Sequence, residues 1–173
     1  MRKRPMVAVN PSRCMGCRSC ELACAVAHSV AKELHSLVRS GERPGYRVNV
    51  EAYERMAVPV HCNHCEDAAC VVACPTGSVY RDAETGLVLH KSARCIGCKM
   101  CVQACPFGVI AMSGNGKGVL KCDLCIERLA VNQEPACVES CPTRALVFAG
   151  EEESNRAKRM KAAERMAMAL QER

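Results

Sequence analysis

Large aromatic side chains are nearly absent from this sequence of 173 residues: it contains no Trp, and aromatic residues make up only 3% of it. A chain of this length can form one or two compact domains, but few large side chains are available to fill a core. Sixteen Cys, by contrast, are far more than ordinary packing needs. Covalent or metal cross-links must therefore supply stability that burial does not.

No export signal is visible in the sequence either. The basic segment at residues 1–6 runs directly into Val7-Ala8-Val9, with no apolar h-region behind it and no small-residue cleavage site. Because disulfides persist in oxidising compartments, this absence argues against a disulfide framework. Nor does any stretch approach the roughly 18 apolar residues that a membrane-spanning helix needs. We expect a cytoplasmic chain with no direct membrane span.

What the sequence does contain is one cysteine motif repeated four times. The first and third repeats have the spacing CxxCxxCxxxC, whereas the second has a four-residue gap in its middle and the fourth an eleven-residue gap. The four quartets are Cys14, Cys17, Cys20 and Cys24; Cys62, Cys65, Cys70 and Cys74; Cys95, Cys98, Cys101 and Cys105; and Cys122, Cys125, Cys137 and Cys141. No Cys is left over.

The spacing of the quartets favours iron–sulfur chemistry. Two-residue gaps let three thiolates wrap one corner of a 4Fe-4S cubane, while the fourth Cys faces away and ligates the other cluster of a pair. Pro75, Pro106 and Pro142 each follow a fourth Cys directly, where they end a short helix and turn the chain into a strand. The first quartet lacks this Pro, so its helix is expected to continue toward Val38. We expect four 4Fe-4S clusters.

Zinc is the main alternative metal, because zinc ribbons also use paired CxxC knuckles. Runs of three Cys and Cys-Pro endings favour iron–sulfur clusters, and a zinc-binding structural protein stays open as a distant alternative. A thioredoxin-like site has one reactive CxxC pair in a βαβ setting, whereas every CxxC here belongs to a larger quartet.

The formal charge of +6 would, on its own, suggest an anionic partner such as nucleic acid. Each cluster core carries about +2 and is held by four thiolates, so four clusters bring the net charge to about −2. The basic residues are then expected to be internal counterions. We predict no nucleic-acid partner, because side chains that could stack on bases are also scarce.

With its quartets in this order, the sequence resembles the four-cluster, ferredoxin-like electron-transfer subunits of the dimethyl-sulfoxide reductase and formate dehydrogenase family. The resemblance covers about residues 6–149. Within that family, the segments CMGCRSCELACAVAHS and CIGCKMCVQACPFGVI look most like the small iron–sulfur subunits of carbon monoxide dehydrogenase and of tungsten-containing aldehyde oxidoreductase.

In that family the first and fourth quartets build one two-cluster ferredoxin module, and the second and third build another inserted within it. The resemblance therefore implies four ligand sets: Cys14, Cys17, Cys20 and Cys141 (cluster one); Cys24, Cys122, Cys125 and Cys137 (cluster two); Cys62, Cys65, Cys70 and Cys105 (cluster three); and Cys74, Cys95, Cys98 and Cys101 (cluster four). The crossover rule of the motif predicts the same exchange of fourth ligands. The missing Pro after Cys24 leaves the geometry of that ligand the least defined.

The resemblance implies a relay of single electrons between a catalytic subunit, which would be a tungsten, molybdenum or nickel enzyme, and an electron-accepting subunit, for which a flavoprotein is one candidate. A tungsten-containing aldehyde oxidoreductase is the preferred partner. Carbon monoxide dehydrogenase, formate dehydrogenase, hydrogenase and a free polyferredoxin are the alternatives. No nucleophile with a paired base, phosphate-binding loop or flavin fingerprint is found, so no catalytic residue is predicted on this chain.

The predicted fold class is α+β, with two interlocked bacterial-type ferredoxin modules made of short helices and β-hairpins. The predicted divisions are an outer module at 1–39 and 110–150, an inner module at 60–109, a connecting loop at 40–59 and a C-terminal helix at 151–173. Apolar pairs that flank turn sequences predict hairpins at 79–89 and 109–120. Gly and Pro residues indicate the connecting loop.

The C-terminal segment 151–173 contains no Cys, Pro or Gly, and Met160, Ala163, Ala167 and Leu170 recur in it at helical spacing. We predict an amphipathic helix whose thin apolar stripe docks onto a partner or onto a second copy of the chain. A solvated charged extension is the alternative.

Histidines and basic residues near the quartets have predicted supporting roles. His61 and His64 bracket Cys62, and we expect them to form hydrogen bonds around a cluster or to face solvent, because each cluster already has four Cys. Four cations beside ligands are expected to neutralise cluster charge and raise the local reduction potential. These are Arg18, Arg94, Lys99 and Lys121.

Overall fold

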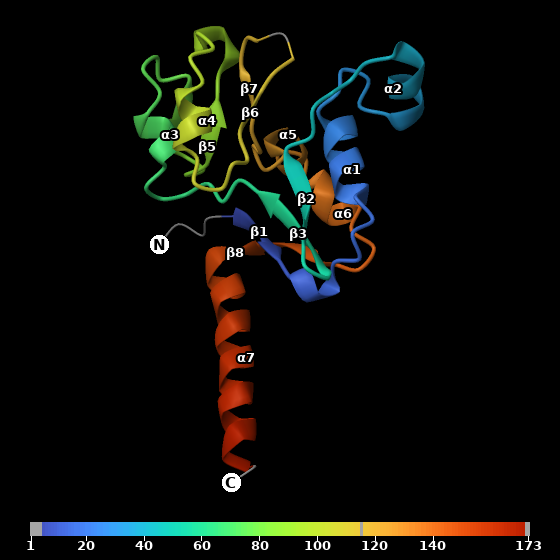
Figure 1. Ribbon diagram of the computed structural model, residues 1–173, viewed down its shortest axis with the longest axis vertical. Coiled ribbons are helices and arrows are strands. Elements are labelled where there is room, and N and C mark those ends of the chain that lie inside the picture. The colour runs from blue at the N-terminus through green and yellow to red at the C-terminus, as the bar shows by residue number, and fades with distance from the viewer. Residues whose placement is uncertain (1–4, 115, 172–173) are drawn as a thin grey trace.

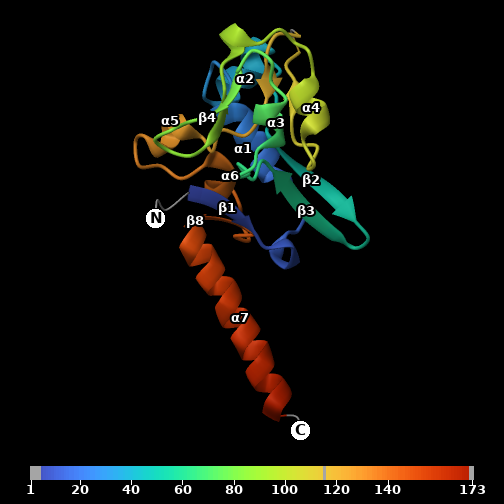
Figure 2. The same cartoon turned by 90° about the vertical axis from the view of Figure 1, so that its left-hand side faces the viewer.

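The computed structural model describes residues 5–114 and 116–171, with only some of the side chains after residue 150. Short helices and two-stranded antiparallel sheets make up its body. One long helix, α7 (Glu151–Gln171), extends away from that body (Figures 1 and 2). This mixture of elements agrees with the predicted α+β class.

The first and last strands of the body pair with each other. Strand β1 (Pro5–Val9) runs antiparallel to β8 (Leu146–Gly150), with Val7 opposite Phe148. Val7 and Leu146 are buried, which places this sheet on the core. The pairing brings the region before the first quartet next to the region after the fourth (Figure 1).

The helices of the quartets also pack in pairs. Helix α1 (Ser19–Ala27), in the first quartet, packs against α6 (Ala136–Glu139) in the fourth. Helix α3 (Ala69–Val72), in the second quartet, packs against α4 (Met100–Ala104) in the third. Helix α5 (Ile126–Leu129) lies between the Cys pairs of the fourth quartet. Quartets one and four are thus neighbours, as are quartets two and three.

The buried core follows the same division into two groups. One group combines Val7, Leu124 and Leu146 with Cys20 and Cys137. The other combines aliphatic residues of the central region with Cys101. Thiols occupy positions that large apolar side chains fill in an ordinary core, in agreement with the scarcity of aromatic residues.

Both predicted hairpins are confirmed. Strands β4 (Val79–Arg81) and β5 (Val88–His90) pair across the turn at 82–87, and β6 (Ala111–Met112) pairs with β7 (Val119–Leu120). Single 3-10 turns, η1 (Pro11–Arg13) and η2 (Ser92–Arg94), precede the first Cys of quartets one and three. The two quartets of equal spacing therefore also share their local entry geometry.

The predicted connecting loop at 40–59 is wrong for its second half. Strands β2 (Val48–Tyr53) and β3 (Met56–His61) form a hairpin there. Val48 and Val50 are buried, and the Val50 N–H donates to Glu21 Oε1 on α1 at 2.6 Å. Pro59 is tolerated because each strand of a two-stranded sheet has a free edge.

The first helix does not continue toward Val38. It ends at Ala27, where His28 Nδ1 donates to the Cys24 carbonyl at 2.7 Å and the Ser29 hydroxyl donates to the Val26 carbonyl at 2.7 Å. These side chains satisfy carbonyls that a longer helix would have used. A separate helix, α2 (Leu34–Ser40), begins after Glu33, whose carboxylate accepts from the Ser36 N–H.

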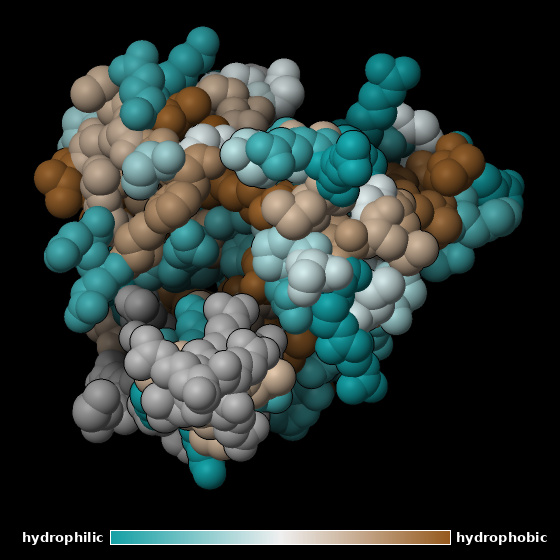
Figure 3. Space-filling view, turned by 60° about the horizontal axis from the view of Figure 1, so that its bottom comes forward, coloured by the Kyte–Doolittle hydropathy of each residue, from teal (hydrophilic) through white to brown (hydrophobic). Residues whose placement is uncertain are grey.

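Helix α7 begins beside β1 and β8 and presents exposed side chains further along. Met160, Met166 and Met168 are 64%, 71% and 57% exposed, and Ala163 and Ala167 are also exposed. The Leu170 side chain, part of the predicted stripe, lies outside the described residues. Seen along α7, hydrophobic and hydrophilic side chains are interspersed on the body behind it (Figure 3). Docking of this helix stays a prediction.

No helix in the described part of the chain combines the length and hydrophobicity needed to cross a membrane.

Candidate cluster-binding sites

All four quartets share one unusual backbone feature. The residue directly before the second Cys has a positive φ in each: Gly16 (+74°), His64 (+47°), Gly97 (+72°) and Leu124 (+61°). A left-handed backbone is unfavourable for His and Leu, and such residues concentrate at functional sites. Its recurrence at the same position of four loops indicates a common structural task.

Loops of this kind turn successive N–H groups toward one concave side and favour negative charge there. The His64 N–H donates to Cys62 Sγ at 3.4 Å, and the Leu124 N–H donates to Cys122 Sγ at 3.4 Å from the equivalent position. The fourth Cys of quartet four also accepts a backbone hydrogen bond, because the Ala145 N–H donates to Cys141 Sγ at 3.2 Å. These N–H groups therefore offset part of the cost that burial imposes on a thiolate, as at Cys122.

Gly97 tests the importance of this loop geometry. An alanine Cβ at this position would lie 2.9 Å from the Gly116 carbonyl oxygen, on a backbone with φ +72°. Gly97→Ala should lower the free energy of unfolding by about 2 kcal/mol and reduce iron binding at one site, because strain and a backbone clash add.

The matched control for this loop is Gly77→Ala. Gly77 has a similar φ of +61°, but nothing lies within 4 Å of the added Cβ. Thermal unfolding and iron content of both holo-proteins provide the measurement, and we expect about half the destabilisation and full iron content for the control. Equal effects of the two substitutions would contradict a special role for the Gly97 loop.

Cys24 lies close to the fourth quartet. The pKa of Cys125 is raised to about 11 and that of Cys137 to about 12, mainly by burial, and the charge of Cys24 is among the smaller causes of both rises. The pKa of Cys122 is also raised well above its ordinary value, first by burial and then by Cys137 and Cys24, among other neighbours. Four thiols from α1 and from the α5–α6 region thus share one buried environment.

Cys141 lies instead close to the first quartet. The Ser19 hydrogen bonds lower the pKa of Cys17, whereas the charge of Cys141 acts in the opposite direction. The pKa of Cys20 is raised to about 11, mainly by burial, and the charge of Cys141 is one of the smaller causes of this rise. The fourth Cys of quartet four therefore faces quartet one, while the fourth Cys of quartet one faces quartet four.

In the two central quartets the fourth Cys also lies close to the other quartet. One pocket is lined by Cys62, Cys65, Cys70 and Cys105, together with apolar residues that include Val88 and Ile110. Burial raises the pKa of Cys70, and the charges of Cys62 and Cys105 raise it further. The pKa of Cys101 is raised by burial and then by Cys74, which belongs to the other central quartet.

The donor chemistry of these sites fits 4Fe-4S clusters. All sixteen Cys are free thiols, and thiolates in sets of four are the ligands that such clusters take. The Cys residues whose charges raise one another's pKa belong, almost without exception, to the same one of the four ligand sets that the family resemblance implies. Cys17 and Cys98 are exposed, whereas each set also has buried or half-buried members. The ligand sets themselves remain a prediction.

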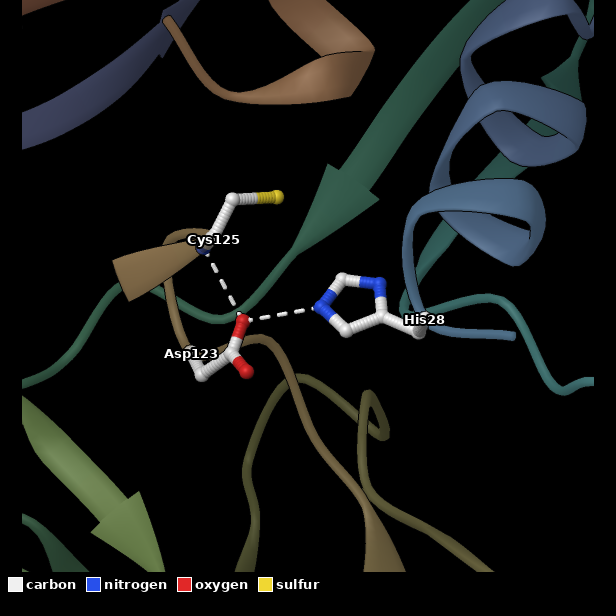
Figure 4. A group of neighbouring side chains, drawn as sticks. All are labelled: His28, Asp123 and Cys125. Atoms are coloured by element: carbon white, nitrogen blue, oxygen red, sulfur yellow. Dashed lines mark hydrogen bonds and ion pairs between the residues drawn. The ribbon is translucent and has the colours of Figure 1, made fainter. Parts of the chain in front are cut away.

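Sequence reasoning missed a cluster of charged side chains beside Cys24. Asp123 Oδ1 accepts from His28 Nε2 at 3.1 Å and from the Cys125 N–H at 3.0 Å (Figure 4). Asp123 Oδ2 accepts from Arg47 at 2.5 Å. The hydrogen bonds from His28 and the charge of Arg47 outweigh burial and hold the pKa of Asp123 well below its usual range. The available signal was the position of His28, four residues after Cys24 and directly after the last residue of α1.

This charged cluster does not form a separate metal site. The ligand atoms of His28, Asp123 and Cys125 lie within 4.8 Å of one another. Both carboxylate oxygens of Asp123 already accept hydrogen bonds, and it is the backbone N–H of Cys125 that bonds to the carboxylate (Figure 4). The group joins the end of α1 to the loop of the fourth quartet and lies beside Cys24 and Cys125.

The histidines near Cys62 are buried and form hydrogen bonds. His61 Nδ1 bonds to the Cys62 carbonyl at 3.0 Å, and the Val88 N–H donates to His64 Nδ1 at 3.1 Å. Burial lowers the pKa of His64 to about 3, so its imidazole is neutral. Of the two predicted roles, hydrogen bonding applies and solvent exposure does not.

Comparison with known proteins agrees with these sites. A family model described as a 4Fe-4S dicluster domain matches residues 53–151, and one described as a 4Fe-4S binding domain matches residues 11–27. An "Iron-sulfur protein" of Rhodospirillum rubrum is 40% identical over 84% of this chain and 82% of its own length.

Two further relatives have names that specify a complex. The thiosulfate reductase electron transfer subunit PhsB of Salmonella typhi is 43% identical over 82% of this chain and 73% of its own length. One of the chains of the anaerobic dimethyl sulfoxide reductase of Escherichia coli is 40% identical over 81% of this chain and 70% of its own length.

Proposed function

Because the chain belongs to the 4Fe-4S dicluster family of iron–sulfur proteins, we propose that it is an electron-transfer subunit with four 4Fe-4S clusters on its sixteen Cys. The observation that carries this proposal is the fourfold recurrence of the left-handed residue before the second Cys. A bound 4Fe-4S cluster accepts and releases one electron at a time.

The proposed arrangement has an outer module of quartets one and four and an inner module of quartets two and three. The pairings of β1 with β8, α1 with α6 and α3 with α4 support it. In each module the fourth Cys of one quartet completes the ligand set of the other. The electrostatic neighbours of Cys24, Cys141, Cys105 and Cys74 support this exchange.

The residues of the chain have defined tasks in this proposal. Backbone N–H groups of the left-handed loops donate to thiolate sulfur and lower the cost of the negative charge. Apolar residues such as Val88 and Ile110 exclude water from the pocket of Cys62, Cys70 and their partners. No residue is assigned a catalytic role, and substrate chemistry is left to a partner.

The proposed partner is a catalytic oxidoreductase subunit. The names of two relatives place them in thiosulfate reductase and dimethyl sulfoxide reductase complexes, which supports a reductase complex as the setting. The narrower preference for a tungsten-containing aldehyde oxidoreductase gains nothing from these names. A free polyferredoxin is the alternative that a copurification experiment separates from the subunit.

Anaerobic purification of the tagged chain from its host tests the proposal. We expect a large metal-containing subunit to copurify and reductive titration of the isolated chain to take up about four electrons, one for each 4Fe-4S cluster. A colourless chain that takes up no electrons would contradict electron transfer. A chain that takes up four electrons but has no partner would favour the polyferredoxin.

Truncation after Gly150 tests the role of α7. Iron per chain should stay unchanged, because α7 extends away from the body that contains the Cys (Figures 1 and 2). The exposed Met side chains suit an adaptable contact surface, so the copurifying subunit or a second copy should be lost. Iron analysis and light scattering of the purified material provide the measurement. If the mass of the particle falls only by that of the removed residues, α7 does not dock onto a partner or a second copy.

A further inference from the structure

Lys121 is the one Lys or Arg that is buried among the residues that the structure describes. It follows β7 directly and precedes Cys122, and its residue is only 3% exposed. Its Nζ donates to the Val88 carbonyl at 2.5 Å and to the Cys122 carbonyl at 2.8 Å. Val88 lies on β5, in the central part of the chain, so this side chain bridges the proposed inner and outer modules.

The surroundings of Lys121 require negative charge. An ammonium group carries three donors and a full positive charge, and its burial is costly unless an opposite charge lies nearby. Both hydrogen-bond acceptors are carbonyl oxygens, which carry no net charge. The compensating charge must come from groups around them.

The two carbonyl oxygens that accept from Lys121 belong to residues of, or beside, two different proposed ligand sets. Cys122, adjacent in sequence, belongs to the proposed cluster-two set. Val88, whose carbonyl accepts from Lys121, lines the pocket of Cys62, Cys65, Cys70 and Cys105, which form the proposed cluster-three set. A 4Fe-4S cluster with four thiolates has a net negative charge, so Lys121 lies close to two anionic groups.

The structure also ranks the four cations that the sequence placed beside ligands. Arg94 and Lys99 are exposed, and the Arg18 side chain is 61% exposed and pairs with Glu21. Solvent and salt screen such charges strongly. Lys121 is the buried member of the group and has the largest expected effect on a neighbouring redox centre.

We propose that Lys121 is a fixed positive charge at the boundary of the two modules, where it raises the reduction potentials of clusters two and three and thereby favours electron passage between the modules. The inference rests on the proposed function. Lys121 is a positioning residue of the relay, because it acts on the clusters through its charge and without ligating iron. Lys99, beside Cys98, has the same charge in an exposed position and should have a much weaker effect.

The test uses the iron-loaded protein with Lys121→Gln, which removes the charge but retains a hydrogen-bond donor. In EPR-monitored redox titrations, two of the four midpoint potentials should fall by about 59 mV or more. This shift corresponds to a tenfold weaker one-electron reduction. The other two potentials should shift by less than half as much. Lys99→Gln and Lys121→Arg should leave all four potentials close to those of the unmodified protein.

Unchanged potentials in an iron-replete Lys121→Gln protein would overturn the inference, as would an equal shift in Lys99→Gln. If Lys121→Gln loses iron, the iron content of Lys121→Met, a second neutral variant, is compared with that of Lys121→Arg, which keeps the charge. If both neutral variants lose the iron of two clusters while Lys121→Arg keeps all of it, the requirement for charge is supported. If Lys121→Arg loses as much, the requirement is refuted. Failure of the unmodified chain to bind four clusters would instead refute the proposed function.

Discussion

Replacing Cys137 by serine is expected to remove the iron of one site and to lower the thermal midpoint of unfolding by about 10 °C. Cys137 is 8% exposed and belongs to the core group that contains Val7 and Leu146. Its loss opens a ligand set and leaves a buried hydroxyl in an apolar setting, at a combined cost of about 3 kcal/mol. Iron analysis and thermal unfolding followed by circular dichroism provide the measurement.

Cys98→Ser is the matched control for this prediction. Cys98 is also a proposed ligand, but it is exposed. We therefore expect the same fall in iron, from about sixteen to about twelve atoms per chain, with less than half the fall in the thermal midpoint. If both variants keep all their iron, these residues are not ligands. If the thermal midpoints of both variants fall equally, burial of the replaced Cys does not determine the loss of stability.

Removal of all iron is expected to abolish the folded body of the chain. Its four sheets have two strands each, and α1, the longest helix before α7, has nine residues among those described. Two-stranded sheets and helices of this length are marginal alone in water. After anaerobic chelation, amide hydrogen exchange in residues 5–150 should lose its protection.

Two controls accompany the removal of iron. Restoring iron and sulfide to the same sample should restore protection, because ligand binding supplies folding free energy. A mock treatment without chelator should change nothing. Persistent protection of β1 and β8 in the iron-free chain would contradict the dependence of the fold on its clusters, since this sheet closes the core.

Local features were predictable from the sequence. The spacing of the quartets predicted iron–sulfur chemistry, in agreement with the family models, and the hairpins at 79–89 and 109–120 follow from apolar pairs around short turns. Each of these signals comes from residues that are close together in the sequence. The β2–β3 hairpin was missed because Gly41, Pro44 and Pro59 indicated a loop, whereas Val48 and Val50 are buried against the core and stabilise a strand.

Long-range contacts were not predictable in the same way. His28 and Asp123 are 95 positions apart and meet beside Cys24. Lys121 looked equivalent to Arg94 and Lys99 in the sequence, and only its contact with Val88, 33 positions away, reveals its burial. The end of α1 depends on side-chain bonds from His28 and Ser29 that no periodicity encodes.

The most direct test of the account is quantitation of iron, acid-labile sulfide and zinc in the anaerobically purified chain. Four 4Fe-4S clusters predict about sixteen iron and sixteen sulfide per chain in a brown protein, with little zinc. A colourless, zinc-containing protein without sulfide would contradict the ligand sets on which both proposals depend.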